Sequence, residues 1–220
     1  LLRIFGPEGM KTYINAIYDT MNFELTFPVE IIEVNSGTIL DERDFYVKCV
    51  PAEHKIDTIA YGFFEKGRPG KFNAEKAEKL GIPKYLWKKL QAREDVIANN
   101  KIVKPEDVLG PERPGRKIVY AVDTRPCENV LNLSKNVDLL IHDGMFANVL
   151  QEKAIEGGHS TALEAAELAK KAGVKQLILT HISSRYPNTD ELLEEAINIY
   201  PNVKIARDLL TIDLPLIKDS

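Results

Sequence analysis

Apolar residues recur along the 220-residue chain with two periods, and the period changes from segment to segment. Residues 10–21 carry apolar side chains at roughly helical spacing, which predicts a helix. Short alternating or continuous apolar runs predict strands. These runs cover residues 1–5, 28–34, 44–50, 56–64, 117–122, 137–141, 176–180 and 208–214.

In the second half of the chain the strand runs alternate with helical segments. Thr161 and Glu164 have the spacing of a capping box, and Gly173 follows the apolar positions as a helix-ending residue. A further helix is predicted over residues 189–200. Alternating strands and helices indicate an α/β fold or a layered α+β fold.

Residues 67–114 interrupt this pattern. A Gly-Arg-Pro-Gly segment at 67–70 ends the preceding strand signal, and the following stretch to residue 100 is lysine-rich, partly helical and poor in strand signal. We expect a body of residues 1–66 and 115–220, with residues 67–114 inserted as a protruding arm.

The charges separate these two parts. Residues 66–104 carry eleven Lys or Arg against four Asp or Glu, a net charge of +7, whereas the whole chain has a net charge of −4. A basic segment on an acidic body is typical of a phosphate-binding appendage, although solvated charged helices give the same pattern.

Composition limits the cellular setting. No apolar run reaches the roughly 18 residues of a membrane span, and no signal peptide opens the chain, so we expect neither. Cys49 and Cys127 form no CxxC pair and no disulfide framework, which favours a reducing, cytoplasmic location.

The candidate chemistry lies at the ends of the strand runs. The four histidines of the chain and Asp123 all lie at such ends or just before a helix; the histidines are His54, His142, His159 and His181. Imidazole and carboxylate groups held by a rigid sheet suit a zinc site that keeps a position open for water. Hydrogen-bonded structural roles fit each position as well, and Asp123 also fits a turn.

Residues 158–161 (GHST) introduce a predicted helix. A helix N-terminus offers free N–H groups that can hold a phosphate, and a histidine there could protonate a leaving oxygen. A plain helix entry capped by Thr161 explains the same residues.

Taken together, these stretches resemble the ribonuclease Z (tRNase Z) family of tRNA 3′-processing endonucleases. The matching stretches, in chain order, are 2–9 (LRIFGPEG), 51–54 (PAEH), 60–63 (AYGF), 68–72 (RPGKF), 80–83 (LGIP), 105–110 (PEDVLG), 115–120 (GRKIVY), 123–126 (DTRP), 139–142 (LLIH), 158–161 (GHST) and 179–183 (LTHIS).

This resemblance implies an αββα metallo-β-lactamase-like sandwich, here partial, that hydrolyses precursor tRNA after the discriminator nucleotide and leaves a 3′-hydroxyl. It implies two Zn²⁺ ions per subunit, a homodimer and an arm that is a tRNA-binding exosite. The implied roles are metal ligand for His54, Asp123 and His181, proton donor for His159, support of the ligands for His142 and Asp143, and phosphate or RNA binding for Ser160, Thr161, Lys71, Lys88 and Lys89.

The chain departs from the family pattern in three places. The HxHxDH motif is absent and is expected before Leu1, so the chain alone should bind zinc poorly and be inactive. Residues 142–145 read HDGM where the family has His-Glu-Ala-Thr, and the arm reads KYLWKK at 84–89 without a Gly-Pro-rich tip. A small-ester or thioester hydrolase of the same fold and a non-catalytic RNA-binding relative are the alternatives.

Overall fold

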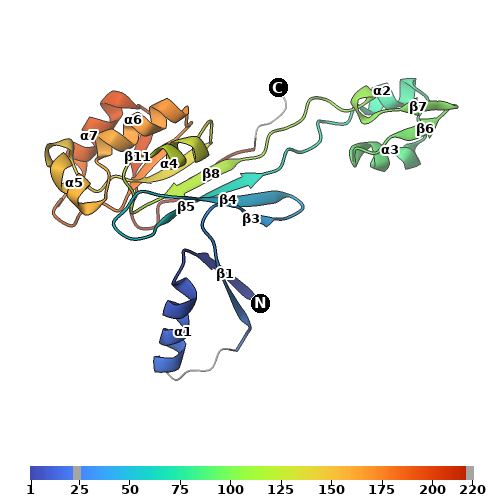
Figure 1. The fold of residues 1–220 in the computed structure, drawn as a ribbon. Helices are drawn as coiled ribbons and strands as arrows, with labels where there is room; N and C mark the ends of the chain where they lie inside the picture. Colours follow the sequence, from blue (N-terminus) through green and yellow to red (C-terminus); the bar gives the residue numbers. More distant parts are fainter. Residues whose placement is uncertain (22–25, 217–220) are drawn as a thin grey trace. The chain divides into compact units, whose positions relative to one another are not determined.

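The computed structural model describes residues 1–21 and 26–216 of the protein. The chain divides into two compact units: residues 1–64 with 117–214, and residues 65–116, to which the stretch from Pro215 is also assigned (Figure 1). These boundaries lie close to those expected for the body and the arm. Residues 217–220 of the expected body lie outside the described residues.

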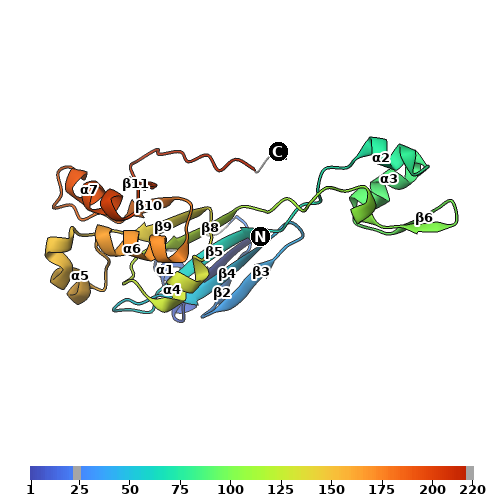
Figure 2. The same cartoon turned by 90° about the horizontal axis from the view of Figure 1, so that it is seen from above.

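A seven-stranded mixed sheet is the centre of the larger unit (Figures 1 and 2). The four adjacent strands from residues 117–121, 139–143, 177–180 and 203–205 run parallel to one another. The strand of residues 59–65 pairs antiparallel with this group, and the strands of residues 37–41 and 45–51 pair antiparallel with each other. In sheet order the strands are β11 (Val203–Ile205), β10 (Leu177–Thr180), β9 (Leu139–Asp143), β8 (Lys117–Ala121), β5 (Ile59–Glu65), β4 (Phe45–Pro51) and β3 (Gly37–Asp41).

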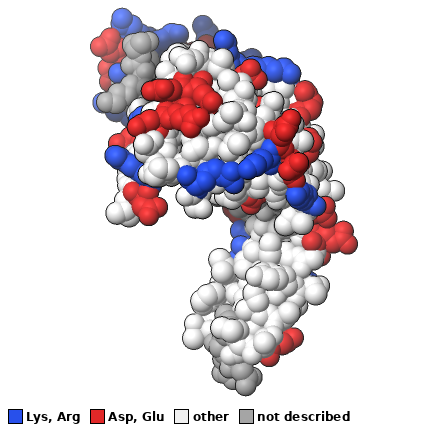
Figure 3. Space-filling view, turned by 90° about the vertical axis from the view of Figure 1, so that its left-hand side faces the viewer, with Lys and Arg blue, Asp and Glu red and all other residues white. Residues whose placement is uncertain are grey.

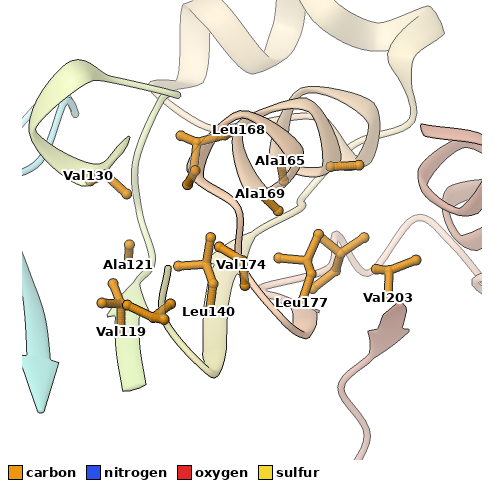
Figure 4. Close-up of a cluster of buried hydrophobic side chains, with 14 of the residues drawn as sticks. Val119, Ala121, Val130, Leu140, Ala165, Leu168, Ala169, Val174, Leu177 and Val203 are labelled. Atoms are coloured by element: carbon orange, nitrogen blue, oxygen red, sulfur yellow. The ribbon is translucent and has the colours of Figure 1, made fainter. Parts of the chain in front are cut away.

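Helices α4 (Glu128–Leu133), α6 (Ala162–Ala172) and α7 (Asp190–Ile199) cover one face of this sheet (Figure 2). The small side chains of Ala165 and Ala169 on α6 allow the helix to lie close to the strands, and Figure 4 shows them facing apolar residues of the sheet. Helix α5 (Gln151–Gly157) and the 3₁₀ turn η2 (Asn148–Leu150) precede α6.

The predicted capping box fixes the start of α6. The Thr161 side chain accepts from the backbone N–H of Glu164 at 3.1 Å, and the Glu164 carboxylate accepts from the Thr161 N–H at 2.9 Å. The helix ends at Gly173, whose φ of 67° is a conformation that glycine adopts without steric cost. The position of His159, two residues before this cap, is therefore determined by a well-specified helix start.

The first part of the chain forms a separate two-stranded parallel sheet of β1 (Leu2–Gly6) and β2 (Val29–Glu33). Helix α1 (Met10–Met21) supplies the crossover that parallel strands require. No residue of α1 is buried, and Tyr13 and Met21 are strongly exposed. The lower part of Figure 3, where α1 lies, shows few charged side chains.

The smaller unit has a hydrophobic core of its own, with Phe72 and Trp87 packed against it. Its two chain ends run side by side, because the backbone N–H groups of Arg68 and Arg113 each donate to the carbonyl of the other residue, at 2.8 and 2.9 Å. The elements are α2 (Ala74–Lys79), α3 (Lys84–Gln91), β6 (Val96–Ala98), β7 (Lys101–Val103) and the 3₁₀ turn η1 (Pro105–Asp107).

Most of the expected elements are confirmed, including α1, α6, α7 and the strands before residue 181. The strand expected over residues 208–214 is wrong, since that stretch is irregular and Leu209 is fully exposed. The edge of β10 is occupied instead by β11, and residues 208–214 pair with no strand among the described residues. Strands β3, β6, β7 and β11 and helices α4 and α5 were not predicted.

No helix among the described residues combines the length and the apolar character needed to cross a bilayer.

Candidate metal centre

Four side chains meet at one edge of the sheet: Asp123, Asp143, His159 and His181. Each offers one ligand atom, and these four atoms all lie within 4.8 Å of one another. Asp123, Asp143 and His181 lie at or just after the ends of β8, β9 and β10, which are parallel neighbours. The carboxyl ends of parallel strands share one edge of a sheet, and this is why residues distant in sequence converge here.

The distances within the group show which atoms are held together. His181 Nε2 lies 3.2 Å from Asp123 Oδ1, and His159 Nδ1 lies 2.8 Å from Asp143 Oδ2. The Asp143 side chain is fully buried, whereas 49% of the Asp123 side chain is exposed. The site therefore has a buried acid at its base and an accessible acid at its mouth.

Asp123 and His181 hold unusual backbone conformations, with φ values of 52° and 61°. Residues other than glycine adopt this left-handed backbone conformation at some cost in free energy. They keep it only where the surrounding structure fixes them. Here the conformation turns both side chains toward one another directly after their strands end. This strain is consistent with a functional constraint on the two residues.

His54 reaches the same region from the loop between β4 and β5. Its Nδ1 donates to the carbonyl of Gly158 at 2.8 Å, and its ring centroid lies 4.9 Å from that of His159. With Nδ1 occupied, Nε2 is the nitrogen left for a ligand, an arrangement common for metal-binding histidines. His54 is nonetheless outside the group of four, so the expected trio of His54, Asp123 and His181 is only partly assembled by the described residues.

His142 and Asp143 are adjacent in β9 but have different surroundings. His142 is fully buried, its Nδ1 donates to the carbonyl of Asp143, and its Nε2 has no hydrogen-bond partner among the described residues. Burial lowers the pKa of His142, outweighing the opposing effects of Asp143 and Glu164. Asp143, expected only as a support for the ligands, is itself a member of the group of four.

Ser160 and Thr161, expected to bind a phosphate, are fully buried in this structure. The Ser160 hydroxyl donates to the carbonyl of Thr124 at 2.6 Å, and the Thr161 hydroxyl caps α6. Both hydroxyls therefore hold the loop that carries His159, and the burial gives no support to a direct contact with RNA. In the smaller unit, Lys71, Lys88 and Lys89 are exposed, as the expected role in binding requires.

Sequence reasoning assigned no role to Arg125. Its side chain is largely buried and bonds both the carbonyl of His159, at 2.6 Å, and the carboxylate of Glu164. The only signal in the sequence was the position of Arg125 two residues after Asp123, which does not reveal its partners.

The donor set fits a metal ion. Two carboxylates and two imidazoles, each with one atom within a few ångströms of the others, match the nitrogen and oxygen ligands that zinc, manganese and iron accept. The site combines this donor set with an exposed side, which leaves room for water or substrate.

Known proteins share both sequence and fold with this chain. The sequence model of the family described as "Beta-lactamase superfamily domain" matches residues 101–182. A ribonuclease Z of Methanosarcina mazei is 44% identical over 97% of this chain and 71% of its own length. A ribonuclease Z of Nitrosopumilus maritimus is 42% identical over 97% of this chain and 72% of its own length.

Solved structures show the same fold at lower sequence identity. The short form of human tRNase Z is 22% identical and superimposes with a TM-score of 0.60, over 97% of this chain and 68% of that protein. The metallo-β-lactamase fold protein YhfI from Bacillus subtilis gives a TM-score of 0.60 at 18% identity, over 94% and 62%. The fold is that of the metallo-β-lactamases, and by its sequence identity to the curated relatives the chain belongs to the ribonuclease Z family.

Proposed function

We propose that this protein is the endoribonuclease that removes the 3′ trailer of precursor tRNA, by hydrolysing the phosphodiester bond after the discriminator nucleotide and leaving a 3′-hydroxyl. The convergence of Asp123, Asp143, His159 and His181 at one sheet edge is the observation that carries this proposal. The identity of 44% over 97% of the chain to a named ribonuclease Z supports the choice of substrate.

Asp123, His181 and His54 are the residues we assign to metal binding, with two Zn²⁺ ions per subunit. When bound, such ions supply an activated water and offset the negative charge that develops on the phosphate. Asp123 would be a metal ligand together with His181, because its carboxylate is half exposed and its Oδ1 lies 3.2 Å from His181 Nε2. His54 contributes through Nε2, since its Nδ1 is held by Gly158.

His159 is the residue we assign to proton transfer. Its Nδ1 lies 2.8 Å from the buried carboxylate of Asp143, which fixes the orientation of the ring. The other ring nitrogen is then the one that gives a proton to the leaving 3′-oxygen. In this assignment His142 stays neutral in the core and supports β9 only.

The basic arm of residues 67–114 is the exosite that we propose binds tRNA, and residues 1–66 with 115–220 form the catalytic body. The compact division at residues 65–116 and the exposure of Lys71, Lys88 and Lys89 support this assignment. Exposed lysines bind the RNA backbone through its phosphates, so their contribution should weaken as salt rises.

A homodimer and a cytoplasmic location complete the proposal, and both rest on the family resemblance. Light scattering on the purified protein gives the molar mass directly. A mass of one chain at micromolar concentration would overturn the dimer.

The deciding experiment maps the cut made by the complete gene product on an end-labelled precursor tRNA. We expect a single product ending at the discriminator nucleotide with a 3′-hydroxyl, loss of cutting after chelation, and recovery when Zn²⁺ is added. Asp123→Asn is the inactive control. Cutting at other sites, or hydrolysis of small thioesters without any cutting of RNA, would refute the proposed reaction.

A further inference from the structure

We propose that Arg125 is a positioning residue, whose guanidinium holds the loop carrying His159 against the loop carrying Asp123. This inference rests on the proposed nuclease function, because His159 matters to the reaction only in that assignment. Arg125 reaches the four-residue group through the backbone carbonyl of His159, and no hydrogen bond described above joins it to the side chains of that group.

The Arg125 side chain spans two segments of the body. Its Nη1 donates to the carbonyl of His159 at 2.6 Å and to Glu164 Oε2 at 2.8 Å, and its Nη2 donates to Glu164 Oε1. Only 16% of the Arg125 side chain and 10% of the Glu164 side chain are exposed. A guanidinium shared between one carbonyl and one carboxylate in a buried setting has little freedom to move.

The backbone of Arg125 connects a third segment. Its N–H donates to the carbonyl of Glu53 at 2.7 Å, directly before His54, while the Glu53 N–H donates to the Thr124 hydroxyl. Arg125 is therefore bonded to the immediate surroundings of His54 and His159, and it follows Asp123 by two residues. One side chain and its own backbone join the three loops of the site.

Glu164 provides a fixed counter-ion for this arrangement. Its carboxylate also accepts from the Thr161 N–H at 2.9 Å and from Gln151 Nε2 at 3.0 Å. Burial would raise the pKa of Glu164, but the hydrogen bonds from Arg125, Thr161 and Gln151 outweigh burial and lower it. The carboxylate thus remains charged, and it is carried by the first turn of α6, whose start is set by the capping box.

Arg125 contributes mainly by fixing the position of His159, and less by its charge. The His159 ring is held at Nδ1 by Asp143 and at its backbone by Arg125. Without the guanidinium, the backbone of His159 loses one restraint and keeps only neighbouring bonds such as that of the Ser160 hydroxyl. The His159 ring is then freer to move relative to Asp123. A shift of the His159 ring would slow catalysis, because proton transfer depends on the distance and direction of the proton donor.

The site of Arg125 is also reachable from outside. The residue lines a surface hollow of about 340 Å³ between α4 and α6, together with Cys127, Glu164 and Lys171. Truncation of the side chain would enlarge this hollow beside a carboxylate that has lost its cation. A free guanidinium ion in solution can enter such a space and restore the missing hydrogen bonds.

The test measures precursor tRNA cleavage by Arg125→Ala and Arg125→Lys in the complete gene product. We expect kcat to fall about 10- to 100-fold in Arg125→Ala, the usual effect of losing a residue that orients a site, with KM changed by less than about twofold. Arg125→Lys keeps the charge but lacks the fork, so its kcat should be intermediate. Millimolar guanidinium should raise the kcat of Arg125→Ala, and methylammonium should not.

Arg116→Ala is the matched control, since Arg116 forms an ion pair with Glu65 elsewhere. It should lower stability without lowering kcat and without a response to guanidinium. If Arg125→Ala lowers only the unfolding temperature while kcat per folded molecule stays that of the wild type, Arg125 is structural and the inference fails.

A second measurement does not depend on cleavage. In ¹⁵N-histidine-labelled protein freed of metal by chelation, the His159 ring signals, assigned by their loss in His159→Asn, should shift in Arg125→Ala and remain in place in Arg116→Ala. Unchanged ring signals would overturn the inference. A wild-type protein that never cuts precursor tRNA would refute the proposed function, while this spectrum would still decide the role of Arg125.

Discussion

The two carboxylates of the site differ in their surroundings, and this difference suits them to different roles. Asp143 is fully buried and accepts from the backbone N–H groups of Met145 and Thr124 as well as lying beside His159. Asp123 is half exposed and lies beside His181. A carboxylate fixed by several donors is suited to orienting a ring, whereas an exposed one is suited to binding a cation.

This contrast gives a prediction for a pair of variants. Asp123→Asn should lose both bound zinc and cleavage, because it removes the negative charge at the mouth of the site. His159→Asn should keep its zinc and lose about 10²- to 10⁴-fold in kcat, the range for loss of a general acid. Metal content by mass spectrometry, with kcat on the same samples, separates the outcomes. Loss of zinc in His159→Asn would make that residue a ligand.

A second prediction at this scale concerns the ion pair of Glu65 and Arg116. Hydrogen bonds from the Arg116 side chain lower the pKa of Glu65 from 4.5 to about 2, although partial burial opposes them. Because the folded pKa is the lower one, the stabilisation is complete above about pH 4.5 and is lost as the pH falls toward about 2.

Glu65→Gln should therefore lower the free energy of unfolding at pH 7, by about 1 kcal/mol or less for a pair that is partly exposed. The difference from the wild type should shrink steadily below pH 4.5. Urea unfolding at several pH values measures it, with Glu75→Gln as the control for losing an exposed acid. A difference that is constant from pH 7 to pH 3 would contradict this account.

At the scale of elements, the sequence located the site but not all of its members. The ends of the strand runs at residues 117–122 and 176–180 drew attention to Asp123 and His181, and in the structure His181 Nε2 lies 3.2 Å from Asp123 Oδ1. Strand β9 was harder, because successive side chains point to opposite faces. His142 faces the core and Asp143 faces the site. Which of the two side chains faces the site depends on the register of β9 in the sheet.

The loop before α6 allows a test of how tightly the elements are fitted. Gly158 has a φ of 80°, and a Cβ there would lie 2.7 Å from His54 Nδ1. Gly9 has a φ of 90°, and no atom of the described residues lies within 4 Å of a Cβ added there. Substitution of Gly9 therefore measures the conformational cost of the backbone alone.

Gly9→Ala should lower the free energy of unfolding by about 1 kcal/mol, the cost of placing alanine in the left-handed region. Gly158→Ala should lower it further and should also reduce zinc content, since His54 has to move. Thermal unfolding and metal analysis of both variants give the comparison. If Gly158→Ala lowered stability and zinc content no more than Gly9→Ala does, His54 would not be constrained by this contact.

At the scale of the whole chain, charge and composition predicted the arm, but not its structure. The lysine excess and the Gly-Arg-Pro-Gly segment at 67–70 indicated an insertion close to the compact unit of residues 65–116. The hairpin of β6 and β7 was missed because each strand has only three residues, too few for a period to be recognised. Its stability comes from packing against α2 and α3, which local sequence does not report.

Removal of the arm is the prediction at this scale. Joining Arg68 to Arg113 through an Asn-Gly turn should leave the body folded, because the backbones of these two residues are already paired. KM for precursor tRNA should rise about tenfold or more, whereas hydrolysis of a small phosphodiester should be unchanged. Steady-state kinetics on both substrates measures this.

Replacement of Lys71, Lys88 and Lys89 by Gln is the milder variant, which keeps the core of the arm. It should raise KM for precursor tRNA at low salt and have little effect at high salt. A loss on both substrates in either variant would show that the arm supports the body and does not bind RNA.

The paired chain ends of the arm have a consequence for how such proteins diversify. Strands β5 and β8 are hydrogen-bonded neighbours, and backbone hydrogen bonds also join residue 65 to residue 116 and residue 68 to residue 113. For the catalytic sheet, the intervening segment is thus equivalent to an ordinary hairpin connection. Evolution, or an engineer, can exchange it for a module that recognises a different RNA without disturbing the register of the strands that carry the chemistry.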